Sequence, residues 1–211
     1  MRRILSFLTP LALAASLLAQ GPSPSKAPAA PKVPSVTPRP AGEFVINMTD
    51  GSHKLLSSYR GKTIVMAFMF TTCEHCQHTA GLLSKIQTEY AAKGVQVLGV
   101  TIDPGAKQGI PVFLKITGAN FPVGYSTEAQ AMKFLHGPSD GWYVPMLAFI
   151  DRNGIVRSQY VVLDPGDPAS MFLQDQDGDP RTGDRGSIRK ELDKLLRTSA
   201  HATPAKKAPK S

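Results

Sequence analysis

Two nearly continuous apolar runs stand out along the chain, at residues 63–70 and 95–102. Runs of this length and composition are typical of parallel β-strands that are buried on both faces. Between them, apolar side chains recur at helical spacing: Leu83, Ile86 and Tyr90. The pattern therefore predicts a strand, a helix and a second strand in that order.

The pattern farther along the chain predicts a second group of elements. We expect helices near residues 110–116 and 127–135 and a short strand at 121–125. A hairpin is expected next, with strands at 146–150 and 155–162 joined by an Asn-Gly turn. Apolar positions at helical spacing then indicate a closing helix: Ile188, Leu192 and Leu195. Strands and helices mixed in this way predict an α/β domain.

The two ends of the chain differ from this central part. Residues 1–20 hold two arginines, an apolar stretch and small residues, which predicts a signal peptide or, as the alternative, an uncleaved anchor. Residues 21–42 contain seven prolines and predict an extended linker. We expect the domain at 43–198 and a basic, disordered tail at 199–211. The leader predicts a periplasmic or other extracytoplasmic location.

The net charge of +8 would by itself suggest a nucleic-acid or membrane partner. Residues 1–42, however, hold five basic and no acidic side chains, and residues 199–211 hold three basic and no acidic ones. Since the chain has 24 Lys and Arg, the 16 that remain balance all 16 acidic side chains. The domain is formally neutral, so we expect no nucleic-acid partner.

The chain has two cysteines, Cys73 and Cys76, and they follow closely on the first apolar run. A two-residue spacer at the start of a helix lets two sulfurs form a disulfide, while free N–H groups and the helix dipole favour a thiolate on the first. A purely stabilising disulfide is the alternative, but closing so short a loop restricts the unfolded chain little. The placement therefore favours redox chemistry.

This order of elements, with Cys-x-x-Cys after the first core strand and Pro145 just before the hairpin, resembles the thioredoxin superfamily. More narrowly, the chain is similar to the TlpA/ResA-like extracytoplasmic thiol-disulfide oxidoreductases, which have a redoxin-type domain. The similarity covers residues 43–162 and includes several short matches: Asp50-Gly51, residues 55–59, Gly61-Lys62, and Ile150-Asp151 with Gly154. It implies a thioredoxin-like three-layer α/β/α sandwich with a central mixed β-sheet.

The resemblance also implies roles for individual residues. Cys73 would be the nucleophile and Cys76 the resolving thiol, and the two would form a redox-active disulfide with no cofactor and no metal. Val144 and Pro145 match the family's cis-proline position and would shape the groove that pairs with a substrate strand. The implied partners are protein thiols and disulfides, together with a membrane or periplasmic electron-transfer protein. An uncleaved leader would tether the domain to the membrane.

The sequence departs from the family pattern around the cysteines. Thr72 stands where Trp is common, Thr79 where the ResA-like branch often has Glu, and Ala67 where thioredoxin has a buried Asp. No family carboxylate is therefore in place to take the proton of the resolving thiol. Glu74 and His75 are the nearby titratable side chains, and they would modulate the site in opposite directions because a cation favours a thiolate and an anion opposes it. The direction of electron flow stays open.

Two other functions fit parts of the sequence. The two cysteines with His75 and His78 are soft or borderline metal ligands, and residues 70–73 resemble the Sco copper proteins. Those proteins, however, use a three-residue spacer and a distant histidine. A thiol peroxidase is the other alternative, but peroxiredoxins have Thr three residues before the reactive cysteine, where this chain has Phe70.

Overall fold

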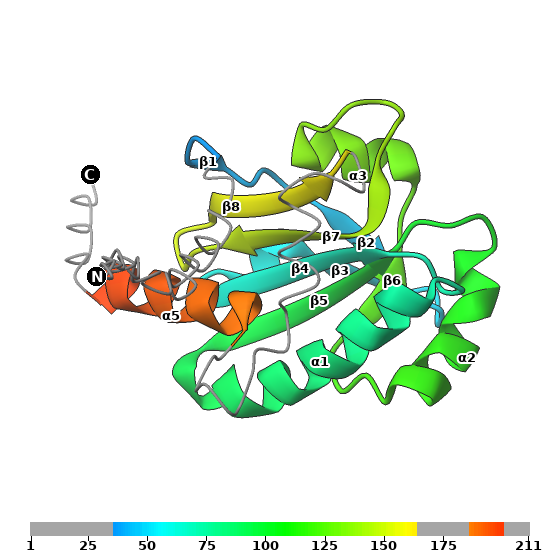
Figure 1. Ribbon diagram of the computed structural model, residues 1–211, viewed down its shortest axis with the longest axis horizontal. Helices are drawn as coiled ribbons and strands as arrows, with labels where there is room; N and C mark the ends of the chain where they lie inside the picture. Colours follow the sequence, from blue (N-terminus) through cyan, green and yellow to red (C-terminus); the bar gives the residue numbers. More distant parts are fainter. Residues whose placement is uncertain (1–35, 164–185, 201–211) are drawn as a thin grey trace, which may run out of the picture. The chain divides into compact units, whose positions relative to one another are not determined.

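The computed structural model describes residues 36–163 and 186–200 (Figure 1). Three sequence predictions fall wholly or mainly outside these ranges: the leader at 1–20, the linker at 21–42 and the tail at 199–211. In the described residues, no helix combines the length and the apolar character that a membrane crossing requires.

The described residues form an eight-stranded sheet with the order β1-β8-β7-β4-β5-β6-β2-β3 (Figure 1). The strands are β1 Arg39–Pro40, β2 Val45–Asn47, β3 His53–Leu55, β4 Thr63–Met69, β5 Val95–Thr101, β6 Val123–Tyr125, β7 Tyr143–Ile150 and β8 Ile155–Val162. β4 pairs in parallel with β5, and β5 with β6, whereas β7 runs antiparallel to both β4 and β8. The sheet is therefore mixed, as the resemblance implies.

Helices cover both faces of this sheet. They are α1 Glu74–Tyr90, α2 Ala106–Thr117, α3 Glu128–Leu135 and α5 Ser187–Ala200, with 3-10 turns η1 Leu56–Tyr59 and η2 Ala91–Lys93. Buried side chains of α1, α2 and α5 share one core cluster with the sheet, and those of α3 share a second cluster with the other face. The three-layer α/β/α sandwich is confirmed.

β4 is the central element of the fold. All seven of its residues are buried, because β5 and β7 flank it and helices cover both faces. Alternate side chains go to the two core clusters, with Val65 in the first and Met66 in the second. The strand predicted at 63–70 is confirmed, and its carboxyl end leads directly into the cysteine motif.

Several elements differ from the sequence prediction. β6 begins at Val123 rather than at 121, and the sequence pattern does not predict β2 and β3. β7 begins at Tyr143, so Pro145 lies inside the strand rather than just before it. α2 begins at Ala106, four residues before the predicted start. The apolar pattern does not reveal this first turn, because Lys107 and Gln108 are polar. β1 lies within the predicted linker at 21–42, because it pairs with the edge of β8 and the chain then buries Ala41.

Candidate active site

Cys73 is the N-cap residue of α1. Its backbone is extended, with φ −79° and ψ 121°, and its side chain makes no capping hydrogen bond. The Cys73 carbonyl accepts a hydrogen bond from the Gln77 N–H at 3.0 Å, which starts the helix. The half-buried sulfur therefore lies at the helix N-terminus, where free N–H groups and the helix dipole favour negative charge.

Cys76 lies in the first turn of α1 and is fully buried. Burial raises the pKa of the Cys76 thiol well above its ordinary value; the Phe70 N–H, 3.4 Å from Sγ, lowers this pKa in part. The Cys73 side chain and the charge of Asp103 raise it further. Both cysteines are free thiols. The pair is thus asymmetric, with one accessible sulfur and one buried thiol that keeps its proton.

Asp103 is a site residue that the sequence analysis missed. Its carboxylate accepts hydrogen bonds from the backbone N–H of Thr71 at 2.9 Å and from the Thr71 hydroxyl at 2.6 Å. Asp103 follows β5 by two residues, just as Thr71 follows β4 by two residues. Parallel strands end at the same edge of a sheet, so the two apolar runs of the sequence already contain the signal that brings these residues together.

The predicted groove residues lie beside the cysteine turn. The Val144–Pro145 peptide bond is cis. β7 pairs with β4 as far as Met146, which lies opposite Phe68, so Val144 and Pro145 continue past the end of β4. Val144 packs against both core clusters, and Cys73 packs against the first of them.

Three aromatic side chains near this turn are not among the groove residues that the sequence predicts. Phe70 and Trp142 form an edge-to-face pair with ring centroids 6.0 Å apart. Tyr143, the first residue of β7, is 50% exposed. An apolar surface therefore accompanies the residues that lead into Val144.

The remaining residues predicted for the site divide by exposure. Thr72, Glu74 and His75 are exposed and lie around the cysteines on the solvent side. Ala67 and Thr79, which stand at the family's carboxylate positions, are buried at 0% and 2% exposure. Asp103 therefore supplies a carboxylate near the cysteine turn from a different position in the fold, and its charge contributes to raising the pKa of Cys76.

The described residues do not support the copper alternative. They contain no group of three or more His, Cys, Asp or Glu side chains arranged to hold a metal ion. Cys76 is fully buried, whereas His75 and His78 are exposed, so these side chains do not converge on one point.

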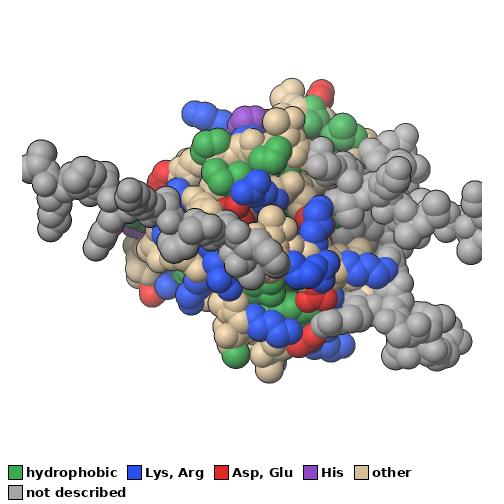
Figure 2. Space-filling view, turned by 90° about the vertical axis from the view of Figure 1, so that its left-hand side faces the viewer, with side chains coloured by type: hydrophobic (Ala, Val, Ile, Leu, Met, Phe, Trp, Pro, Cys, Tyr) green, Lys and Arg blue, Asp and Glu red, His purple; other side chains and the backbone are tan. Residues whose placement is uncertain are grey.

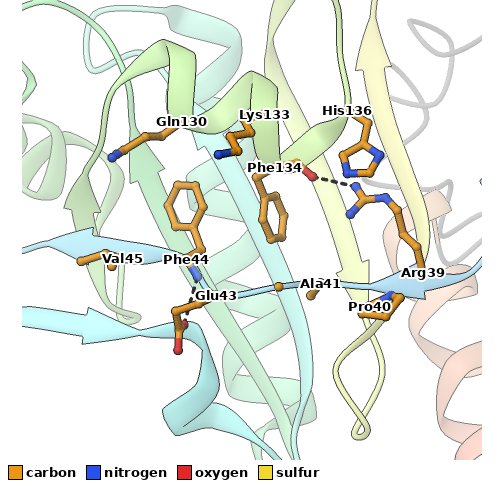
Figure 3. Close-up of a pocket in the computed structure, with 11 residues that line it drawn as sticks. Arg39, Pro40, Ala41, Glu43, Phe44, Val45, Gln130, Lys133, Phe134 and His136 are labelled. Atoms are coloured by element: carbon orange, nitrogen blue, oxygen red, sulfur yellow. Dashed lines mark hydrogen bonds between the residues drawn. The ribbon is translucent and has the colours of Figure 1, made fainter.

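A separate hollow of about 430 Å³ lies between the chain at 39–45 and α3 (Figure 3). Arg39 crosses it to donate a hydrogen bond to the Phe134 carbonyl at 2.7 Å and another to Gln159 at 3.0 Å. The hollow is lined by neither cysteine nor by any residue of the cysteine turn. It lies between β1 and α3 and is separate from the cysteine site.

The sequence profile of the Redoxin family matches residues 28–172, which is more than half of the chain. The chain belongs to the Redoxin family. The match includes the cysteine turn, Asp103 and the Val144–Pro145 bond, so the site described above lies within the family domain.

This redoxin is similar to two curated relatives, both named thiol-disulfide oxidoreductase ResA. It is 28% identical over 118 residues to the protein of Geobacillus kaustophilus, a match that covers 56% of this chain and 64% of the relative. It is 29% identical over 92 residues to the protein of Bacillus subtilis, covering 44% of this chain and 51% of the relative. The redoxin thus spans between half and two thirds of these relatives, and the resemblance to the ResA-like branch is confirmed.

Solved structures show the same fold. A putative thiol:disulfide interchange protein DsbE from Chlorobium tepidum is 26% identical, with a TM-score of 0.53, and the match covers 66% of this redoxin and 94% of that chain. A thioredoxin family protein from Chlorobium tepidum TLS has a TM-score of 0.56 at 19% identity, with 76% and 98% covered. The second likeness concerns the fold alone.

Proposed function

We propose that this redoxin is a thiol-disulfide oxidoreductase that exchanges the Cys73/Cys76 dithiol with disulfides in proteins. The observation that carries the proposal is the asymmetry of the pair at the start of α1. Cys73 is partly exposed at the helix N-terminus, and Cys76 is a fully buried thiol next to it. An attacking thiolate and a resolving thiol need these two environments. The names of the ResA relatives agree with it.

The exchange balances in two steps. The Cys73 thiolate attacks one sulfur of a substrate disulfide, so a mixed disulfide forms and the other substrate sulfur leaves as a thiolate. Cys76 then loses its proton to the solvent or to the departing thiolate and attacks the Cys73 sulfur. The second substrate thiolate leaves, the substrate gains two electrons, and Cys73 and Cys76 end as a disulfide. The reverse sequence oxidises a substrate.

The substrate segment is proposed to bind along the start of β7. Val144 and Pro145 extend past the last pair between β7 and β4, so the Val144 backbone is available to an extended strand next to Cys73. Tyr143 and the Phe70–Trp142 pair add apolar surface at this point. We expect the groove to favour substrate segments with apolar side chains beside the disulfide.

The proposed compartment is outside the cytoplasm. The apolar leader at residues 1–20 supports it, and disulfides in proteins persist in such compartments. The proposed partner is a membrane or periplasmic protein that resets the pair after each turnover. Glu74 and His75 lie exposed around the cysteines, and we propose that they and Thr72 modulate the pair through charge and access.

Two serine variants test the proposal. We expect Cys73→Ser to abolish turnover in a dithiothreitol-driven assay of insulin disulfide reduction, because the attacking sulfur is lost. We expect Cys76→Ser to accumulate a mixed disulfide with the substrate, visible as a higher-mass species on non-reducing gels, because nothing resolves the intermediate. Retained turnover in the Cys73→Ser variant would refute the assignment.

A further inference from the structure

The turn between β4 and α1 is fixed from three sides through Thr71, which is 6% exposed. Asp103, after β5, binds both the N–H and the hydroxyl of Thr71. Gln77 of α1 donates a hydrogen bond from its side chain to the Thr71 carbonyl at 3.0 Å. Gly109 of α2 leaves no spare space, since a Cβ added there would lie 2.5 Å from the Thr71 hydroxyl oxygen.

The same turn contacts both cysteines. The residue before Thr71 is Phe70, whose N–H donates to Cys76 Sγ at 3.4 Å. The Phe70 carbonyl accepts a hydrogen bond from the Cys73 N–H at 3.4 Å. A displacement of Thr71 would therefore move one contact to each member of the pair, and the hydrogen bonds of Asp103 and Gln77 to Thr71 oppose it.

We propose that Asp103 is a positioning residue for the Cys73/Cys76 pair: its carboxylate fixes the turn through Thr71, and its negative charge shifts the thiol-disulfide equilibrium toward the disulfide. The sign follows from electrostatics, because a nearby anion opposes a thiolate in the reduced form and has no such effect on the neutral disulfide. The charge of Asp103 likewise contributes to raising the pKa of Cys76. The inference rests on the proposed function in one respect only: Cys73 and Cys76 must interconvert between the dithiol and the disulfide.

Asp103→Asn tests the charge. Asn keeps the shape and an oxygen that accepts from the Thr71 N–H, but it removes the negative charge. The protein is equilibrated in glutathione buffers, and the fractions of dithiol and disulfide are measured by thiol alkylation and mass. We expect the equilibrium constant to change by about threefold to tenfold in favour of the dithiol, equivalent to about 15 to 30 mV in reduction potential. The midpoint of urea unfolding, measured alongside, reports any loss of structure.

Asp50→Asn is the matched control. Asp50 makes the same kind of contacts as Asp103, accepting from the N–H of Ser52 at 2.9 Å and from its hydroxyl at 2.6 Å, but it lies in an exposed turn. We expect its equilibrium constant to equal that of the wild type. A potential for Asp103→Asn that matches the wild type, or a shift of equal size in Asp50→Asn, overturns the charge part of the proposal.

Thr71→Val tests the positioning separately and covers the case in which Asp103→Asn does not fold. It keeps the Asp103 charge but loses the hydroxyl contact, so we expect alkylation of Cys73 and turnover to slow by about threefold or more. Thr71→Ser, which keeps the hydroxyl, should recover most of the rate. Equal rates for the Val and Ser variants overturn the positioning part.

The outcomes also separate this inference from the proposed function. A wild-type protein with a defined potential but no turnover on protein disulfides would refute the proposed function, while the effect of Asp103 on the potential would stand. A wild-type protein that reduces insulin, with no effect of either site variant, would refute only the role of Asp103.

Discussion

Cys76 differs from Cys73 by burial more than by chemistry. It is three residues farther along α1, where the sheet and helix enclose it completely. A thiolate there would lack water, so the protonated form is favoured and the pKa of Cys76 is raised. In the proposed exchange, resolution of a mixed disulfide would therefore need a step that removes this proton or admits water to Cys76.

The raised pKa of Cys76 predicts a pH dependence of stability in the reduced protein. In the unfolded chain a cysteine ionises near pH 8.5, roughly, whereas folded Cys76 keeps its proton to higher pH. The associated stability is complete below that value and is lost as the pH rises toward the folded pKa. We expect the free energy of unfolding of the wild type to fall by up to about 1.4 kcal/mol per pH unit above pH 9 relative to Cys76→Ser.

Urea unfolding between pH 7 and pH 10.5 under reducing conditions provides the measurement. The Cys76→Ser variant retains Cys73 and every other titrating group, so the difference between the two curves isolates Cys76. Curves that stay parallel across this range would contradict the burial argument.

At the scale of elements, α2 packs closely against the cysteine turn. Gly109 lies in α2 directly against Thr71, and its lack of a side chain permits the contact. Gly81, in α1, has an open environment, with the Thr117 carbonyl oxygen 3.9 Å from the place of a Cβ. A side chain at Gly109 would therefore clash with Thr71, whereas the space around Gly81 admits one.

Alanine at each glycine tests this difference. We expect Gly109→Ala to lower the free energy of unfolding by about 1 to 2 kcal/mol, because overpacking against Thr71 outweighs the better helix propensity of Ala. Gly81→Ala should raise it by up to about 1 kcal/mol, since the helix gains and nothing clashes. Chemical denaturation of both variants checks the pair, and equal effects would show that the contact at Thr71 relaxes freely.

At the scale of the molecule, α5 closes one face of the sheet. Its apolar side chains at 188, 192 and 195 are buried in the first core cluster, as the sequence predicts. Glu191, 3% exposed, accepts a hydrogen bond from the buried hydroxyl of Ser158 in β8 at 2.7 Å. Tyr90 of α1 donates to Asp193 at 2.9 Å. Polar contacts to a strand and to a helix therefore fix how α5 lies on the sheet.

Loss of the buried Glu191 contact should weaken the whole domain. We expect Glu191→Ala to lower the free energy of unfolding by about 2 kcal/mol, because Ser158 loses its acceptor inside the core. Lys194→Ala is the control: Lys194 is 58% exposed and lies 3.5 Å from the same carboxylate, so its loss should cost less than about 0.5 kcal/mol. Urea midpoints measure both, and a Glu191→Ala protein as stable as Lys194→Ala would contradict this account.

Charge at this scale follows the sequence. The basic excess belongs to residues 1–42 and 199–211, whereas 43–198 are formally neutral. Figure 2 shows acidic side chains set among the basic ones on the face that it presents. This mixture of signs agrees with the formal neutrality of residues 43–198.

Much of the fold follows from local patterns in the sequence. Nearly continuous apolar runs identify β4 and β5, and helical periodicity identifies α1, α3 and the buried face of α5, because such patterns depend only on neighbouring residues. The Cys-x-x-Cys spacing and its place after a buried strand likewise predict the reactive pair. The start of β7 and the pairing of β1 could not be found in this way, since both depend on a partner strand elsewhere in the chain.

The sequence by itself therefore determined the class of fold, the central strands and the two cysteines, because these are expressed over short stretches of chain. Only the tertiary structure decided how the cysteine turn is fixed. Asp103 binds Thr71 although the two are 32 residues apart in the sequence, and Gly109 of α2 packs against the same residue. These contacts exist because β4 and β5 are parallel neighbours that end at one edge of the sheet, a relation that local periodicity does not express.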